Sequence, residues 1–239
     1  MIKRIIDTWK LTATELYVTL LFMLGCGIFG LIIEGVVLTV DAEANSTIIG
    51  TLFAIFVGVF ANWIFGIFAF GNSFNTVMSL GSTRKEFLIA NGVTDYVNVI
   101  IETIAIIIFY FVESFLCKVI YADREFDNLV WFLADYRIVL GIIIILPAIK
   151  MLGGALILKF KKVAYWIMWA LWMVTFLGFN RFADYIAKNP ESLIARICSG
   201  ILEFVTGMSG IAQAVTFLII TCIFIAGTVL LVRKEAVTV

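Results

Sequence analysis

The residues best suited to chemistry in this sequence are a few charged side chains set inside long apolar stretches. Glu102 lies within residues 97–119 and Lys150 within residues 138–158, and both stretches are otherwise mostly apolar. An isolated charge near the centre of a bilayer costs roughly 2.5–3.5 kcal/mol, so such charges are paired or functional. Counted along helices that rise about 1.5 Å per residue, the two side chains lie at a similar depth. We therefore expect Glu102 and Lys150 to form a buried ion pair.

Several kinds of catalytic chemistry are excluded by what the sequence lacks. The chain contains no histidine, which removes Ser-His and Cys-His nucleophile pairs and most zinc sites. Its four cysteines show no metal-ligand spacing, and no GxxxxGK[ST] phosphate-binding loop is present. We predict no catalytic residue and no metal site on this chain, and no nucleotide site of its own. A partner or an ion gradient would have to supply any energy that it uses.

The elements that must position these charges are membrane-spanning helices. The composition is 63% hydrophobic and 14% charged, whereas soluble domains carry about 25% charged residues. A span needs about 20 mostly apolar residues. The sequence predicts an all-α integral membrane protein, a single domain over residues 1–239 with no nucleic-acid partner. Its six predicted spans cover residues 16–40, 48–70, 97–119, 138–158, 163–179 and 211–232.

The orientation of the spans follows from the uneven distribution of Lys and Arg. Most bases lie near the two termini, in the loop between the second and third predicted spans, and between the fourth and fifth. Short cytoplasmic loops carry an excess of these residues. Both termini are therefore predicted to be cytoplasmic, in agreement with an even number of spans.

The first ten residues alternate bases with apolar side chains. Ile2, Ile5, Ile6 and Trp9 would share one face of a helix. This pattern favours an amphipathic helix that lies in the membrane interface before the first span. The alternative is that the segment is only the positive flank of that span.

The loop between the second and third predicted spans is the most informative stretch. Residues 71–92 are too polar for a span, yet too apolar for a free loop. Ser82 is the expected N-cap, and Lys85 instead of a glutamate stands at the position that would complete a capping box. Gly81 and Gly92 bracket a short amphipathic helix, a candidate docking surface for a soluble partner.

The run Met78-Ser-Leu-Gly-Ser-Thr-Arg-Lys-Glu-Phe87 resembles the segment between the second and third spans of permease subunits in type-2 ABC exporters. The order of an N-terminal surface helix, six spans and a semi-polar outer segment is similar as well. By this resemblance the run is a cytoplasmic coupling helix. Its contacts with an ATP-binding subunit would be Gly81, Ser82, Arg84, Lys85, Glu86 and Phe87. The alternative is that Arg84 and Lys85 are ordinary positive charges at the cytoplasmic face.

The resemblance also implies partners and a cargo. Two permeases, identical or different, would work with two ATP-binding subunits that hold ATP and Mg²⁺. The small size is similar to that of permeases that export amphipathic peptides, or give immunity to them, in the cytoplasmic membrane of Gram-positive bacteria. A lipid-like cargo is a further expectation. The residues expected to line the translocation path are Glu34, Asn62, Gly66, Trp169, Trp172 and Phe176.

Plainer interpretations exist for the same residues. Small residues on a helix face allow close packing, and aromatic residues on the fifth span also suit lipid contact or dimer packing. Pro147 with Gly153 and Gly154 indicates either a bendable span or a static kink. Residues 180–210 suggest an interfacial or re-entrant helix pair between the fifth and sixth spans, or else a surface helix in the loop.

Two other function classes compete with an exporter permease. A substrate-binding membrane component of an ATP-driven vitamin or metal importer also has six spans, although it would lack a coupling segment such as residues 78–87. A membrane-bound lipid-modifying enzyme would need Asp or His residues clustered at one membrane face. The nearest such cluster, residues 123–127, includes the base Arg124.

Overall fold

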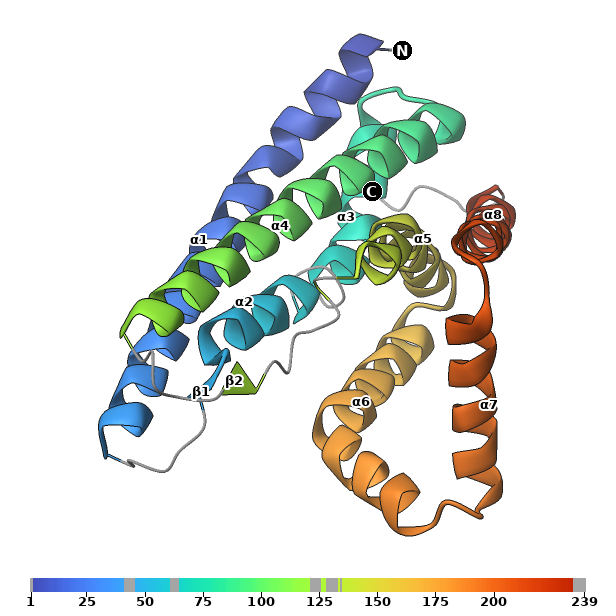
Figure 1. Cartoon of the computed structure of the whole chain (residues 1–239). Helices are drawn as coiled ribbons and strands as arrows, with labels where there is room; N and C mark the ends of the chain where they lie inside the picture. Colours follow the sequence, from blue (N-terminus) through green and yellow to red (C-terminus); the bar gives the residue numbers. More distant parts are fainter. Residues whose placement is uncertain are drawn as a thin grey trace.

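The computed structural model describes residues 2–40, 46–60, 65–120, 126, 127, 133 and 135–233. This part of the chain is helical apart from a pair of two-residue strands (Figure 1). The helices are α1 (Ile2–Val40), α2 (Ile49–Phe60), α3 (Ile67–Ser79), α4 (Arg84–Ile120), α5 (Tyr136–Phe160), α6 (Lys162–Lys188), α7 (Leu193–Gly207) and α8 (Gly210–Val232). Strand β1 (Ser46–Thr47) pairs in parallel with β2 (Phe126–Asp127).

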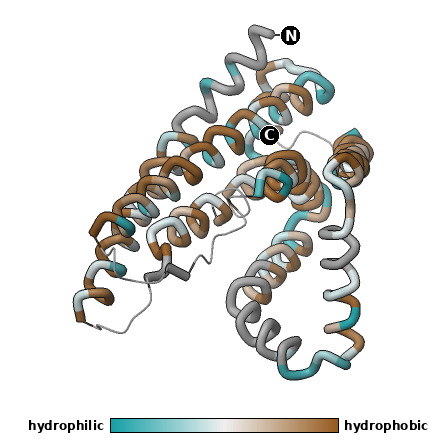
Figure 2. The backbone as a smooth tube through the Cα atoms, viewed as in Figure 1, coloured by the Kyte–Doolittle hydropathy of each residue, from teal (hydrophilic) through white to brown (hydrophobic). Residues whose placement is uncertain are grey.

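The surface of the molecule is apolar, and many of its polar side chains are buried. Leu21 on α1 is 68% exposed and Phe111 on α4 is 64% exposed, whereas Thr94 and Thr228 are buried. Figure 2 shows apolar residues along α1, α4, α5 and α8, with polar residues at the start of α4 and at the turn between α6 and α7. This distribution is the reverse of a soluble protein and suits a molecule surrounded by lipid.

Four of the described helices are long and apolar enough to cross a membrane, as in a multi-pass membrane protein. They are the Glu15–Val40 part of α1, together with α4, α5 and α8. These four contain the predicted spans 16–40, 97–119, 138–158 and 211–232. The predicted span 48–70 covers the 12-residue α2 and the start of α3, with residues 61–64 outside the described part, and the span 163–179 lies within α6.

The predicted N-terminal surface helix is not a separate element. Helix α1 runs without a break for 39 residues from Ile2 to Val40. No glycine or proline lies between Lys10 and Leu16, so nothing in the sequence ends the helix before the apolar part begins. The spacing of apolar residues was correctly assigned to a helix, but its separation from the first span was wrong.

Glycines bring α1 and α2 into backbone contact. A Cβ atom on Gly30 would lie 2.7 Å from the Cα of Gly50, and one on Gly50 would lie 2.7 Å from the carbonyl oxygen of Gly27. Further along the same pair, Met23 packs against Gly58. Small residues at such crossings let the backbones of two membrane helices approach closely. Helices α1 and α2 therefore pack against each other through glycines.

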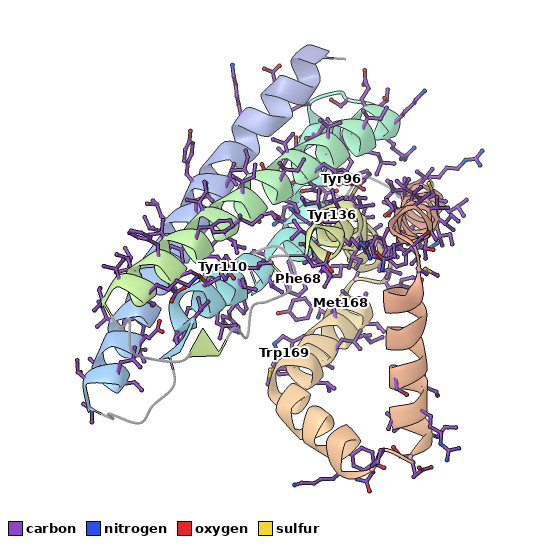
Figure 3. All side chains as sticks on the ribbon, viewed as in Figure 1. Phe68, Tyr96, Tyr110, Tyr136, Met168 and Trp169 are labelled. Atoms are coloured by element: carbon purple, nitrogen blue, oxygen red, sulfur yellow. The ribbon has the colours of Figure 1, made fainter. Side chains whose placement is uncertain are left out.

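Helices α5 and α8 pack side by side in a parallel orientation, with Gly141 against Phe217 and Leu152 against Gly227, and α4 joins them at the proline of α5. Pro147 has no N–H to donate within its helix. The carbonyl of Ile144 accepts hydrogen bonds from the Tyr96 hydroxyl of α4 at 3.0 Å and from the Thr221 hydroxyl of α8 at 3.2 Å. Figure 3 shows Tyr96 beside α5. Side-chain hydroxyls of the neighbouring helices thus bond to the backbone of α5 at the turn that contains the proline.

Gly153 and Gly154, which the sequence analysis associated with a bendable span or a static kink, are packing positions in the structure. Both are buried, and a Cβ atom on either would collide with Ile67 or Phe70 of α3. Helix α5 continues through both glycines to Phe160.

An aromatic cluster joins the end of α3, the start of α4 and the ends of α5 and α8. We call it the Phe87 cluster; its buried members are Phe70, Phe74, Phe87, Met151, Ala155 and Val232. The Phe87 ring meets Phe70 and Phe74 edge-on, with ring centroids 5.2 and 5.3 Å apart. Such edge-on pairs add stability beyond the area that they bury.

Helix α6 extends beyond its predicted end at residue 179 to Lys188, and the chain then turns into α7 (Figure 1). The Ser192 hydroxyl accepts from the Ala195 amide and caps α7, and the Ser209 hydroxyl caps α8 in the same way. Residues 180–188 thus continue the helix that contains the fifth predicted span, and α7 follows it within residues 180–210.

Candidate functional site

A cavity of about 800 Å³ lies between helices α1 to α5. Phenylalanines and aliphatic side chains make up most of its wall. Its polar lining residues are Glu15, Thr19, Asn72, Asn98, Glu102 and Lys150. A concave, mostly apolar site with a few convergent polar groups is the usual form of a small-molecule binding site. A second hollow, on the surface of α8, offers only apolar side chains and the Cys222 thiol.

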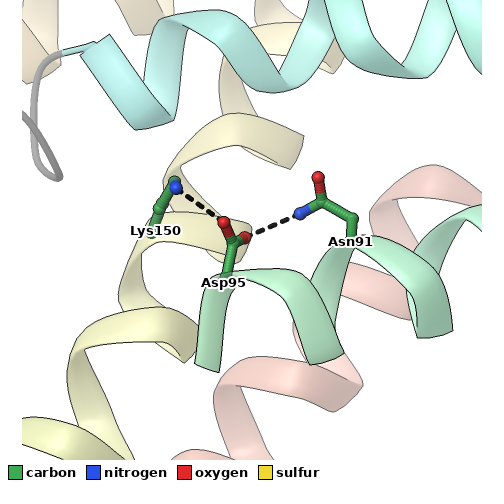
Figure 4. Close-up of polar contacts among 3 residues, drawn as sticks. All are labelled: Asn91, Asp95 and Lys150. Carbon is green, nitrogen blue, oxygen red and sulfur yellow. Dashed lines mark hydrogen bonds and ion pairs between the residues drawn. The ribbon is translucent and has the colours of Figure 1, made fainter. Parts of the chain in front are cut away.

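Lys150 forms a buried ion pair with Asp95 beside the cavity. The Lys150 ammonium lies 2.6 Å from Oδ1 of Asp95, and both side chains are largely buried. The Asn91 amide donates to the other carboxylate oxygen of Asp95 at 2.7 Å (Figure 4). The carboxylate thus has a charged and a neutral donor, which offsets much of the cost of burying it.

Gly66 makes room for this ion pair. The aliphatic chain of Lys150 crosses the backbone at Gly66 so closely that a Cβ atom there would overlap Cε of the lysine. Gly66 also lines the cavity. The absence of a side chain at Gly66 is therefore a steric requirement for the path that Lys150 takes to Asp95.

The acid that is hydrogen-bonded to Lys150 is Asp95, whereas the sequence analysis paired the lysine with Glu102. The two acids are two helical turns apart on α4. The prediction began the third span at residue 97 and left Asp95 in a loop, whereas α4 begins at Arg84 and carries Asp95 into the bundle. Glu102 is buried, lines the cavity with Lys150 and acts electrostatically on it.

A polar stripe on α4 was readable from the sequence but was not recognised. Asn91, Asp95, Asn98 and Glu102 follow one another at spacings of four, three and four residues, which places them on one helix face. All four side chains are buried in the structure. Extending the third predicted span toward its N-terminus would have revealed this stripe.

The turn between α3 and α4 carries the residues predicted for coupling. Gly81 adopts a left-handed conformation, with φ of 81°, which a residue with a side chain rarely adopts. Arg84 and Lys85 are exposed at the first turn of α4. Leu80, just before the glycine, is 73% exposed. The turn therefore presents two bases and a leucine to its surroundings.

A capping box fixes the start of α4, although the sequence analysis expected an N-cap at Ser82 without a box. The N-cap is Thr83 and not Ser82. The Glu86 carboxylate accepts from the Thr83 amide at 2.9 Å and from the Thr83 hydroxyl at 3.0 Å, and the Glu86 amide donates back to that hydroxyl at 3.3 Å. The box is present because Thr83 and Glu86 have the required three-residue spacing.

The structure also corrects two sequence predictions about residues 81–92. No separate short helix ends at Gly92, because α4 continues from Arg84 to Ile120. Phe87 is not a surface contact: its side chain is 0% exposed at the centre of the Phe87 cluster. Its role in this structure is to anchor the start of α4 to α3, α5 and α8.

The predicted path residues that the structure describes with their side chains, Glu34, Gly66 and Trp169, do not gather in one place. Gly66 lines the cavity, whereas Glu34 is buried on α1 and acts electrostatically on Glu113 of α4. Trp169 is exposed on α6, where its ring meets that of Trp166 edge-on (Figure 3). Asn62 lies outside the described residues, and so do the side chains of Trp172 and Phe176.

Glu113 is a buried acid to which the sequence analysis gave no role. Its carboxylate accepts from the Gly50 amide at 2.7 Å, from the Thr51 amide at 2.6 Å and from the Thr51 hydroxyl. These amides belong to the first turn of α2, which Ile48 precedes without a side-chain acceptor. Glu113 thus caps α2 from another helix and is stabilised by the helix dipole. The local sequence of α2 gives no signal of it.

No family model, curated protein or solved structure matches this chain. The functional argument therefore rests on the cavity, the buried charges and the α3–α4 turn.

Proposed function

We propose that this chain is the membrane-embedded permease subunit of an ATP-driven exporter of the type-2 ABC class, with ATP and Mg²⁺ bound by a separate subunit. The observation that carries the proposal is the α3–α4 turn, a rigidly capped and exposed basic tip at the end of a long continuous helix. Arg84 and Lys85 at this tip offer positive charge to an acidic partner surface.

The length of α4 supports a tip that stands outside the membrane. Its 37 residues give roughly 55 Å of helix, whereas the hydrocarbon core is about 30 Å thick. The apolar part begins near Val97, so Arg84 lies roughly 20 Å further along the axis. A soluble subunit could reach Arg84 and Lys85 without entering the bilayer.

The packing behind the tip supports mechanical transmission into the bundle. Phe87 lies one turn beyond the exposed bases, meets two rings of α3 edge-on and belongs to a cluster that also includes residues of α5 and α8. Two turns further on, Asp95 holds Lys150 of α5. A force applied at Arg84 and Lys85 would therefore act on three other helices, and it would bear directly on one wall of the cavity.

The remaining parts of the proposal concern topology and cargo. The chain would cross a bacterial cytoplasmic membrane six times with both termini in the cytoplasm, and the α6–α7 turn would lie on the outer side. It would pair with a second permease subunit, a copy or a different chain. An amphipathic peptide or a lipid-like molecule suits the exposed apolar surface, since such a cargo partitions into the lipid that surrounds it.

The experiment is a mild-detergent purification of the chain from its native membrane, in which co-purifying proteins are identified. We expect a stoichiometric soluble protein with a GxxxxGK[ST] phosphate-binding loop. The double variant Arg84→Ala/Lys85→Ala should lose it, while Lys159→Ala/Lys162→Ala, which removes two exposed bases at the α5–α6 turn, should retain it. Retention by both variants, or absence of such a protein, would contradict the proposal.

One observation favours a second candidate, the substrate-binding membrane component of an ATP-driven vitamin or metal importer. The cavity is lined by helices of a single chain, as such a component requires. This candidate predicts that the chain retains a bound solute and that its energising partner stays bound to the Arg84→Ala/Lys85→Ala variant.

A further inference from the structure

The cavity between helices α1 to α5 opens onto the apolar outer surface of the molecule. Val18 and Phe22 of α1 and Phe65, just before α3, line the cavity and are also exposed. The cavity volume of about 800 Å³ lies within the range of about 300–1,000 Å³ that is usual for small-molecule sites. In a bilayer such exposed apolar side chains contact lipid. A molecule dissolved in the membrane could therefore enter the cavity from the side.

Asn98 of α4 is a polar residue of the cavity wall whose carbonyl oxygen has no donor. The residue lines the cavity and is only 7% exposed. Within the described part of the molecule its Oδ1 atom accepts no hydrogen bond. A buried acceptor without a partner costs free energy, and folded proteins pair nearly all such groups. A molecule that fills the cavity can supply the missing donor.

The chemistry of this wall favours an uncharged hydroxyl as the donor. The Lys150 ammonium, which also lines the cavity, is bonded to Asp95 at 2.6 Å and is thus engaged within the chain. Burying a charged headgroup in a mostly apolar cavity costs more than burying a neutral one. A hydroxyl both donates and accepts, so it complements the oxygen and the N–H groups of an asparagine amide. An ether or an ester can only accept.

We propose that this cavity binds a single-chain amphipathic alcohol from the surrounding lipid, with its hydroxyl donating to Oδ1 of Asn98 and its alkyl chain against the phenylalanines of the wall. Those phenylalanines are Phe22, Phe56, Phe60, Phe65 and Phe68. Since lipid is as apolar as this wall, the alkyl chain gains little by leaving the bilayer. The hydrogen bond to Asn98 therefore selects the alcohol. The proposal concerns binding to this chain alone and does not depend on a partner subunit or on export.

The first test compares three probes that share an alkyl chain and differ in the headgroup. Dodecanol is an uncharged donor, dodecyl methyl ether cannot donate, and dodecylammonium donates but is charged. Equilibrium binding of each radiolabelled probe is measured on the purified full-length chain in a zwitterionic detergent without hydroxyl groups, so that the detergent offers no competing donor. We expect saturable binding of dodecanol, with the other two probes about fivefold weaker or more. Equal or tighter binding of either of these two, or saturable binding of none, would overturn the proposal.

The second test assigns the selectivity to Asn98. Asn98→Leu retains the approximate size of the side chain and removes the amide, so dodecanol binding should weaken by about fivefold, to the level of the ether. The matched control is Thr94→Val. It removes another buried hydroxyl without a partner in the described part of the molecule, one turn earlier on α4 and outside the cavity wall. A preference for dodecanol that survives Asn98→Leu, or one that Thr94→Val also removes, would overturn the proposal.

A third variant keeps the proposal testable if Asn98→Leu does not fold, which size-exclusion chromatography checks. Val18 is exposed where the cavity opens, so a larger side chain there is tolerated by the bundle. Val18→Trp should obstruct the opening and weaken the binding of dodecanol. Unchanged affinity for dodecanol in a folded Val18→Trp variant would overturn the proposal.

Discussion

At the scale of single residues, the interior of the bundle depends on how Lys150 reaches Asp95. The lysine comes from α5 and the aspartate from α4. The lysine side chain passes over the backbone of Gly66, where no side chain blocks its path. Breaking a buried ion pair by removing one partner typically costs about 3–5 kcal/mol, because the other charge stays buried without compensation. Displacing the lysine by a steric clash should act in the same direction.

Gly66→Ala should therefore destabilise the protein. The new Cβ atom would overlap Cε of Lys150, so the lysine must move away from Asp95. We expect the free energy of unfolding to fall by about 1–3 kcal/mol, the usual cost of overpacking. The matched control is Gly71→Ala on α3, where the nearest side-chain atom would be 3.9 Å away. Denaturant titration in mixed micelles measures both, and equal effects would contradict the steric account.

A double-mutant cycle separates the ion pair found in the structure from the one that the sequence suggested. Asp95→Asn and Lys150→Met, alone and together, should give an interaction energy of about 0.5–3 kcal/mol. The corresponding cycle with Glu102→Gln should give a smaller value, because Asp95 is the hydrogen-bonded partner of the lysine. A larger interaction energy for Glu102 than for Asp95 would show that the assignment of the pair is wrong.

At the scale of secondary-structure elements, two helix starts are fixed in different ways. Thr83 and Glu86 cap α4 within the local sequence. Glu113 caps α2 from a distance of more than 60 residues along the chain. Both arrangements satisfy backbone N–H groups that a helix cannot pair by itself.

Thr83→Ala should lower stability by about 1 kcal/mol, the usual cost of losing an N-cap. It should also speed amide hydrogen exchange in the first turn of α4. Ser82→Ala, one residue earlier, is the control and should change neither quantity, because Ser82 is not the cap. If Ser82→Ala had the larger effect on exchange, the capping assignment would be reversed.

Glu113→Ala should destabilise the start of α2. The Gly50 and Thr51 amides would lose their acceptor in a buried place, which costs about 1–3 kcal/mol. Glu113→Gln retains a carbonyl acceptor and should cost less. The free energies of unfolding of both variants test the assignment. A glutamine variant as unstable as the alanine variant would indicate that the negative charge, and not the hydrogen bonding, stabilises α2.

The sequence predicted these elements to different degrees for physical reasons. The capping box is local and was readable, but the preceding serine was chosen instead. The apolar face of residues 2–9 suits both a separate surface helix and the first turns of α1, so periodicity could not decide between them. The Glu113–α2 contact and the Asp95–Lys150 register depend on how distant helices pack, and no spacing within one helix encodes them.

At the scale of the whole molecule, composition already indicated a helical membrane protein. Four described helices are apolar and long enough to cross a bilayer, and their exposed faces are apolar. The cavity could not be read from the sequence, because its lining comes from five helices. Helix α4 connects these parts. It is one continuous helix that extends from the exposed bases at its start, past the Phe87 cluster, to the wall of the cavity.

The most direct test of this account is site-specific photo-crosslinking in the native membrane. One photoreactive residue replaces Leu80, which is exposed at the α3–α4 turn, and another replaces Tyr136, which is exposed at the start of α5. The account predicts that position 80 captures a soluble protein with a GxxxxGK[ST] phosphate-binding loop and that position 136 does not. Capture of such a protein from both positions, or from position 136 alone, would contradict it, as would its absence from the products of position 80.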